Sequence, residues 1–156
     1  MPRFAGSLLV VVSLIAATVS GAGGEKKATP KDNPDGTWVV IGMEQNGMKV
    51  PAEALEKLNL KLTLKGEDYT VTMAGKIADK GTSKVDTQKK PNAADIKSEE
   101  GPNKGKTILA IVEVTGDSMK ACYDMDGKGR PTEFAAKEGS GHTLILYKRE
   151  AKKEGD

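Results

Sequence analysis

The feature that most constrains the fold of this chain is a regular alternation of apolar and polar residues within short segments. In residues 60–65, leucine occupies every second position and alternates with lysine or threonine. The residues Gly66-Glu67-Asp68 follow as a turn, and residues 69–73 resume the alternation with Tyr, Val and Met on the apolar face. A repeat of two is the period of a β-strand that buries one face, so these segments predict an antiparallel hairpin.

Comparable segments recur along the chain and predict an all-β domain. The other expected strands are 38–43, 75–86, 95–97, 107–115, 118–123 and 142–149. Residues 75–86 are polar and indicate an edge-like strand, whereas residues 107–115 are apolar on both faces and indicate a central one. Pro51 and the residues after it predict one or two helical turns, which can cover one mouth of a barrel. We therefore expect a small antiparallel up-and-down β-barrel of about eight strands, with at most one short helix.

The only tryptophan, Trp38, opens the first strand, and Arg149 ends the last one. A guanidinium group packs well on an indole face, so this pair is expected to close one end of the barrel. Gly36 leaves room for the chain to pass beneath the indole. A tryptophan here is also compatible with a purely structural role in the core.

The N-terminal residues have the pattern of an export signal. A basic start is followed by an apolar run over residues 8–17 and then by Ser20-Gly21-Ala22. This order predicts a signal peptide over 1–22 and a secreted or periplasmic protein, with an uncleaved anchor as the alternative. Residues 23–35 are expected to be a flexible lead-in, 36–149 the barrel domain, and 150–156 a charged tail. No membrane span is expected after cleavage.

Composition restricts the classes of partner. The formal net charge is +2, and lysine alternates with acidic residues along the chain. This pattern is typical of a solvated surface and argues against nucleic acid as a partner. The single cysteine, Cys122, cannot form an internal disulfide, so the domain must depend on its hydrophobic core. We expect a monomer.

No motif predicts a catalytic or metal site. His142 follows Gly139-Ser140-Gly141, but the hydrolase elbow requires a glycine where Lys137 or Glu138 stands, so a surface histidine is favoured over a catalytic one. The run 124–129 resembles a calcium loop only in part, and a hairpin turn is the favoured reading. We expect no cofactor, no metal and no enzymatic activity.

Two further residues have open alternatives. Cys122 shares a strand face with Ser118 and Lys120, and is read as an inert, partly buried thiol, with intermolecular pairing or reactivity as alternatives. Arg130 precedes a proline that restricts its backbone. It either meets an anionic ligand at a barrel mouth or pairs with Asp124, Asp126 or Glu133.

Taken together, several short runs resemble one family of proteins. These runs are Gly36-Thr37-Trp38, Pro91 with Asp95-Ile96, Cys122-Tyr123, Arg130-Pro131-Thr132-Glu133-Phe134 and Tyr147-Lys148-Arg149. They resemble an uncharacterised group of small, mostly secreted bacterial proteins that is abundant in planctomycetes. The resemblance covers roughly residues 35–149 and implies a lipocalin-like fold, with no established activity. The second motif typical of lipocalins has no match here.

The expected function is non-enzymatic binding of a small hydrophobic or amphipathic molecule inside the barrel. The candidate ligand-facing residues are Leu60, Leu62, Leu64, Val71, Ile111 and Arg130. The alternative is a protein-interaction module of the cell envelope, such as an inhibitor that acts through its loops or its N-terminal tail. A barrel filled with its own side chains would exclude the ligand.

Overall fold

The computed structural model describes residues 33–151. The predicted signal peptide, the lead-in up to residue 32 and the tail from residue 152 lie outside the described residues. The elements in chain order are β1 (Gly36–Gln45), β2 (Met48–Lys49), α1 (Ala52–Leu58), β3 (Lys61–Lys65), β4 (Asp68–Met73), β5 (Lys76–Asp86), β6 (Asn92–Glu100), β7 (Thr107–Thr115), β8 (Ser118–Asp124) and β9 (His142–Arg149).

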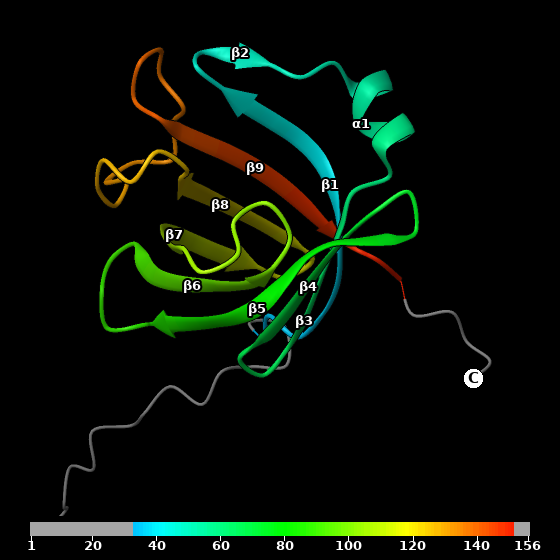
Figure 1. Ribbon diagram of the computed structural model, residues 1–156, viewed down its shortest axis with the longest axis horizontal. Helices are drawn as coiled ribbons and strands as arrows, with labels where there is room; N and C mark the ends of the chain where they lie inside the picture. The colour runs from blue at the N-terminus through cyan, green and yellow to red at the C-terminus, as the bar shows by residue number, and fades with distance from the viewer. Residues whose placement is uncertain (1–32, 152–156) are drawn as a thin grey trace, which may run out of the picture.

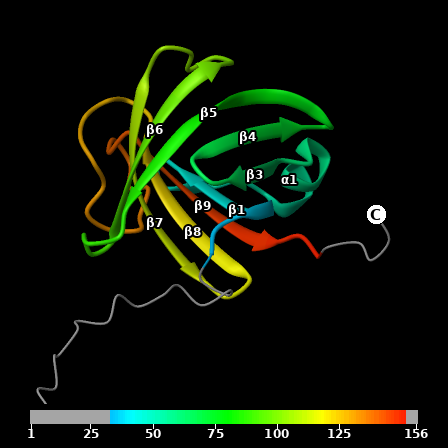
Figure 2. The ribbon, with the colours of Figure 1, turned by 90° about the horizontal axis from the view of Figure 1, so that it is seen from below.

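The strands form one closed antiparallel ring. Each strand from β3 to β8 pairs with the next along the chain, and β1 pairs with both β3 and β9, which closes the ring. The short β2 extends the far end of β1 through the Asn46-Gly47 turn, where both residues have positive φ. Figure 1 shows the sequence of strands, and in Figure 2 β3 and β4 lie across the ring from β7 and β8. The predicted eight-stranded up-and-down barrel with one short helix is confirmed.

The local predictions agree with the structure in most places. The hairpin of residues 60–73 is present as β3 and β4, and β7 and β9 have the expected bounds. The helical turns form α1, which lies next to β1 in the connection between β2 and β3 (Figure 1). The expected short strand around residues 95–97 is longer, because β6 continues its pairing with β5 and β7 on both sides.

The polar sequence of β5 predicted an edge strand, and this prediction was wrong. Strand β5 pairs along its length with both β4 and β6, and both ladders contain a β-bulge. At Gly81 a side chain would overlap the carbonyl oxygen of Lys97, so the two strands approach too closely for any other residue. Closure of the barrel removes every edge from the main ring, and polarity on the outer face reflects solvent contact.

One end of the barrel is closed by Trp38 and Arg149. The indole is fully buried, and the guanidinium carbon lies 4.2 Å from its ring centroid. The indole Nε1 donates a hydrogen bond to the carbonyl of Pro34 at 2.8 Å. Arg149 donates to the carbonyls of Asp35 and Asn33 at 2.6 and 2.8 Å. The last residues of the expected lead-in are therefore fixed across this end of the barrel.

Two further residues complete the closed end. Gly36 has φ +129°, and a Cβ there would lie 3.1 Å from a terminal nitrogen of Arg149, so glycine gives the guanidinium its space. Asp117, in the β7–β8 turn, lies 3.4 Å from Arg149 Nε. None of the helices in the described residues is long and apolar enough to span a membrane.

Candidate functional site

The barrel interior contains a partly open cavity of about 1140 Å³. Its wall is built from the inward-facing residues of all eight strands of the ring, and most of them are apolar. The lining includes Val40, Met43, Leu60, Leu62, Leu64, Val71, Val85, Ala94, Ile96, Ile108, Ala110, Val112, Val114, Met119, Ala121 and Ile145. A volume of this size exceeds the roughly 300 Å³ that a small-molecule site needs. The interior is therefore hollow in part, beside a packed cluster of buried side chains that contains Trp38, Leu62, Tyr69, Met119, Ala121 and Tyr147.

Four of the six candidate ligand-facing residues line this cavity. Leu60, Leu62, Leu64 and Val71 face it from β3, β4 and the residue before β3. Leu62 and Val71 are directly opposite each other across the hairpin, so they present one continuous apolar surface. The helix α1 was expected to cover one mouth of the barrel, but none of its residues lines the cavity.

Ile111 does not face the cavity, and its prediction was wrong. In β7 the lining residues are Ile108, Ala110, Val112 and Val114, which places Ile111 on the outer face. Ile111 is nevertheless only 2% exposed, and its cross-strand neighbour Cys122 is 0% exposed. The sequence could not assign this parity, because β7 is apolar on both faces.

The connection between β8 and β9, residues 125–141, covers part of the outer face of β6–β8. Pro131 and Ala136 of this segment are fully buried, and the thiol of Cys122 donates to the carbonyl of Ala135 at 3.4 Å. Burial raises the pKa of the Cys122 thiol. Lys120 on the same outer face lies 4.5 Å from the ring centroid of Phe134. We call this packing the outer core.

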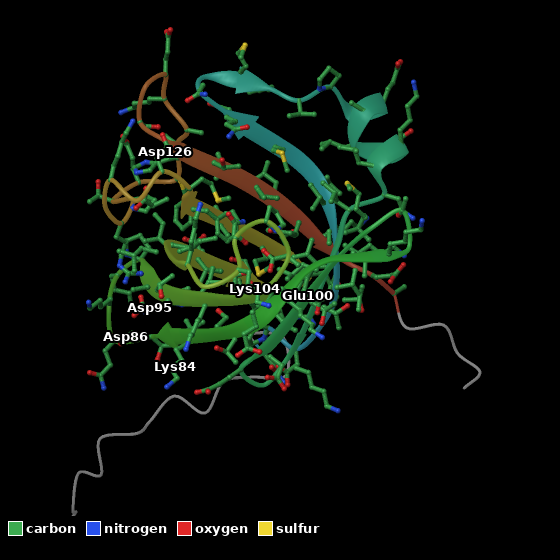
Figure 3. All side chains as sticks on the ribbon, viewed as in Figure 1. Lys84, Asp86, Asp95, Glu100, Lys104 and Asp126 are labelled. Carbon is green, nitrogen blue, oxygen red and sulfur yellow. The ribbon has the colours of Figure 1, made fainter. Side chains whose placement is uncertain are left out.

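Arg130 belongs to the outer core and not to a ligand site. Its guanidinium donates to the carbonyls of Ala94 and Ala110 at 2.9 and 2.8 Å and forms an ion pair with Asp95. Asp95 alternates with two cavity-lining residues of β6, so it points outward, on the same side of the molecule as Asp126 (Figure 3). None of the predicted acidic partners is used. Arg130 instead fixes the connecting segment to β6 and β7.

The partial calcium-loop pattern is a turn. Asp124 accepts hydrogen bonds from the backbone N–H groups of Lys128 and Gly129 at 3.0 and 2.8 Å, so its carboxylate organises the turn. Asp126 lies 3.4 Å from the ammonium group of Lys128. Across residues 33–151, no three acidic, histidine or cysteine side chains are grouped as metal ligands. His142 Nε2 lies 3.3 Å from the carbonyl oxygen of Gly129.

Among the polar residues of the cavity wall are two hydrogen-bonded groups that sequence reasoning did not single out. The first is a pair of tyrosines on β8 and β9, Tyr123 and Tyr147, whose hydroxyl oxygens are 2.8 Å apart. Burial raises the pKa of Tyr123 to about 12 and holds the pKa of Tyr147 well above its ordinary value. Both side chains are therefore neutral donors at physiological pH.

The second polar group is centred on Asp79 of β5. Its carboxylate accepts hydrogen bonds from the hydroxyl groups of Tyr69 at 3.1 Å and Ser98 at 2.7 Å. Burial is the main reason that the pKa of Tyr69 rises to about 12. The carboxylate is thus already occupied by two donors from neighbouring strands. This arrangement is a satisfied polar network at one side of the cavity.

One hydroxyl group in the wall, that of Thr143, has no hydrogen-bond partner within residues 33–151. Thr143 of β9 lines the cavity, and its Oγ1 is buried without a hydrogen-bond partner among the described residues. Leaving such a group unsatisfied costs about 1–3 kcal/mol. Thr143 is directly opposite Tyr123 across the β8–β9 ladder. The wall therefore contains one unsatisfied hydroxyl group, itself shielded from solvent, next to the tyrosine pair.

A sequence signal for the tyrosine pair exists. Alternation in β8 places Tyr123 on the same face as Met119 and Ala121, and Tyr147 shares the inward face of β9 with Ile145. The register between β8 and β9, which brings the two tyrosines together, cannot be predicted from either segment alone.

Comparison with known proteins adds no assignment. No model of a known protein family matches the sequence, and a search of curated proteins finds no match either.

Proposed function

We propose that this protein is a non-enzymatic binding protein that holds a small hydrophobic or amphipathic molecule inside its barrel. The observation that carries the proposal is the hollow interior of about 1140 Å³ with a predominantly apolar lining. Buried apolar surface favours an apolar ligand by roughly 25 cal/mol per Å² removed from water. The barrel fold is compatible with this role.

The small residues in the wall support the proposal. Ala94, Ala110 and Ala121 lie on three successive strands and face the cavity. Ala94 is directly opposite Ala110. Larger apolar residues at these positions would occupy the interior, as in barrels that pack their own core.

The proposal is tested by thermal denaturation of residues 33–151 with palmitate, farnesol and menadione as probes. A ligand that binds only the folded state raises the melting temperature, by about 10 °C at a concentration of about 100 times its dissociation constant. Native mass spectrometry of the same samples gives the stoichiometry. One bound molecule per chain is expected.

The matched variants are Val71→Trp and Thr70→Trp, which lie next to each other on β4. Val71 faces the cavity, so tryptophan there fills part of the interior, whereas Thr70 points to the outer face. The first variant should lose the ligand-induced shift, and the second should keep it. If no probe shifts the wild type, or if both variants respond equally, barrel binding is wrong. A protein-interaction role through loops or the tail then becomes the leading alternative.

We also propose that the protein is exported and belongs to the lipocalin-like planctomycete group that its short motifs resemble. The support for export is the residue pattern of positions 1–22. The support for the group is that pattern of motifs together with a closed eight-stranded barrel. Intact-mass measurement of the protein from its native envelope fraction should show a chain that begins near Gly23. A mass that retains residues 1–22 would contradict export.

A further inference from the structure

Most neighbours of the tyrosine pair are apolar, and the pair borders the packed inner cluster, to which Tyr147 belongs. Cross-strand neighbours of Tyr123 are Ala110 and Thr143, and those of Tyr147 are Met119 and Val40. All four of these neighbours line the cavity. Of these four neighbours, only Thr143 carries a polar side chain, and no hydrogen bond links either tyrosine hydroxyl to a charged group.

Proton counting shows what the pair can offer. Two hydroxyl groups carry two protons, and the contact at 2.8 Å uses one of them. The tyrosine that accepts this hydrogen bond keeps its own O–H group, and no described residue accepts it. Accepting a hydrogen bond also polarises the remaining O–H and makes it a stronger donor. The pair therefore presents one activated donor at the cavity wall.

The surroundings select the charge of the partner. An anionic head group at the pair would need a cation to offset its burial. Two lysines line the cavity, but Lys61 is paired with Glu150, Lys90 donates to the carbonyl of Thr87, and neither is bonded to the tyrosines. The carboxylate of Asp79 also faces the cavity and would repel an anion. A neutral acceptor such as an ester or ketone oxygen satisfies the free O–H without that cost.

We propose that Tyr123 and Tyr147 anchor the uncharged carbonyl oxygen of an otherwise apolar ligand, an inference that rests on the proposed binding function. The ligand's chain then lies against the apolar wall, and its carbonyl group accepts the free tyrosine hydrogen. This assigns the ligand class as apolar molecules with one neutral carbonyl group, such as fatty esters or long-chain ketones.

The test compares three probes that differ only at the head: methyl laurate, laurate and tridecane. Binding to the wild type and to variants is measured by equilibrium dialysis with radiolabelled probes. The wild type should bind methyl laurate more tightly than laurate at neutral pH. Tridecane reports on the apolar wall alone, and its affinity is compared between protein variants and not with that of the ester, because an ester loses hydration on burial that an alkane does not have.

The decisive variant is the double replacement Tyr123→Phe with Tyr147→Phe, because either hydroxyl alone can still donate. It should bind methyl laurate about 2- to 10-fold more weakly than the wild type does, as expected for the loss of one net hydrogen bond, with tridecane binding unchanged. The control Tyr69→Phe removes a hydroxyl that is already bonded to Asp79 and should leave the affinity for methyl laurate unchanged. Circular dichroism verifies that each variant is folded.

The two proposals fail in different ways. If the double variant binds methyl laurate as tightly as the wild type does, or loses methyl laurate and tridecane to the same extent, the tyrosine anchor is wrong while barrel binding stands. Tighter binding of laurate than of methyl laurate overturns the neutral-carbonyl assignment. If none of the probes binds, both the anchor and the proposed function are overturned.

Discussion

Alanine replacements of Trp38 and Arg149, singly and together, test whether these residues act as one closure. The indole is fully buried and the guanidinium lies over its face. Both side chains also hold the segment 33–35, through one hydrogen bond from the indole and two from the guanidinium. Removing either residue should release that segment. The second replacement then removes fewer stabilising contacts and costs less unfolding free energy than it would alone.

The structure sets the expected magnitudes. Loss of a buried tryptophan typically costs about 3–5 kcal/mol of unfolding free energy. Arg149→Ala should cost about 2 kcal/mol, because it removes two hydrogen bonds at a partly exposed side chain. A shared contact of this type gives a coupling of about 1–2 kcal/mol. The double variant should therefore cost clearly less than the sum of the single losses.

Urea denaturation of the four proteins, followed by circular dichroism, measures the coupling. Fluorescence is unsuitable, because Trp38 is the only tryptophan. Arg149→Lys serves as a matched variant that keeps the charge but loses the planar, bidentate geometry, and it should be intermediate. Losses that add to within about 0.5 kcal/mol would show that the two residues act independently, and the closure argument would then be refuted.

Three further predictions follow from single sites. Gly81→Ala should cost about 3 kcal/mol or more of unfolding free energy in urea denaturation, because the new Cβ overlaps the Lys97 carbonyl. The control Gly116→Ala has no atom near the new Cβ and should cost only about 1 kcal/mol, from its positive φ. The pKa values of Tyr69 and Tyr123 are raised to about 12, so their contribution to stability should be complete below about pH 10 and disappear as the pH rises from about 10 to about 12. Ultraviolet titration of tyrosinate, together with unfolding measurements, should show this loss. Tyrosines that titrate normally in the folded protein would contradict it. Cys122 should react with a thiol reagent much more slowly in the folded than in the unfolded protein, because it is buried and its pKa is raised; equal rates would contradict the outer core.

Much of the barrel was predictable because its strongest signals are local. Alternation in residues 60–73 identified the β3–β4 hairpin and four of the cavity-lining residues. The pairing of Trp38 with Arg149 followed from the positions of two rare side chains in the first and last strands. In these places one residue pattern has one structural solution, so the sequence alone decides it.

The errors arise where the outcome depends on segments far apart in the sequence. The inward or outward assignment of Ile111 depends on whether another segment covers the outer face of β7, and that cover is the connection of residues 125–141. Arg130 pairs with Asp95, which is 35 positions away, rather than with an acidic neighbour. The polar sequence of β5 hid its two ladders, because a closed barrel has no edge for polarity to mark.

The outer core also explains how a hollow barrel can be stable. A cavity deprives β6, β7 and β8 of the packing that an inner core would give their inward faces, where Ala94, Ala110 and Ala121 leave space. The same strands bury their outward residues, including Ile111 and Cys122, beneath residues 125–141. The outer core thus adds dispersion and hydrophobic burial to these strands from outside the ring. A strand that is apolar on both faces is the expected sequence of such a wall, because one face packs in the outer core and the other lines the cavity.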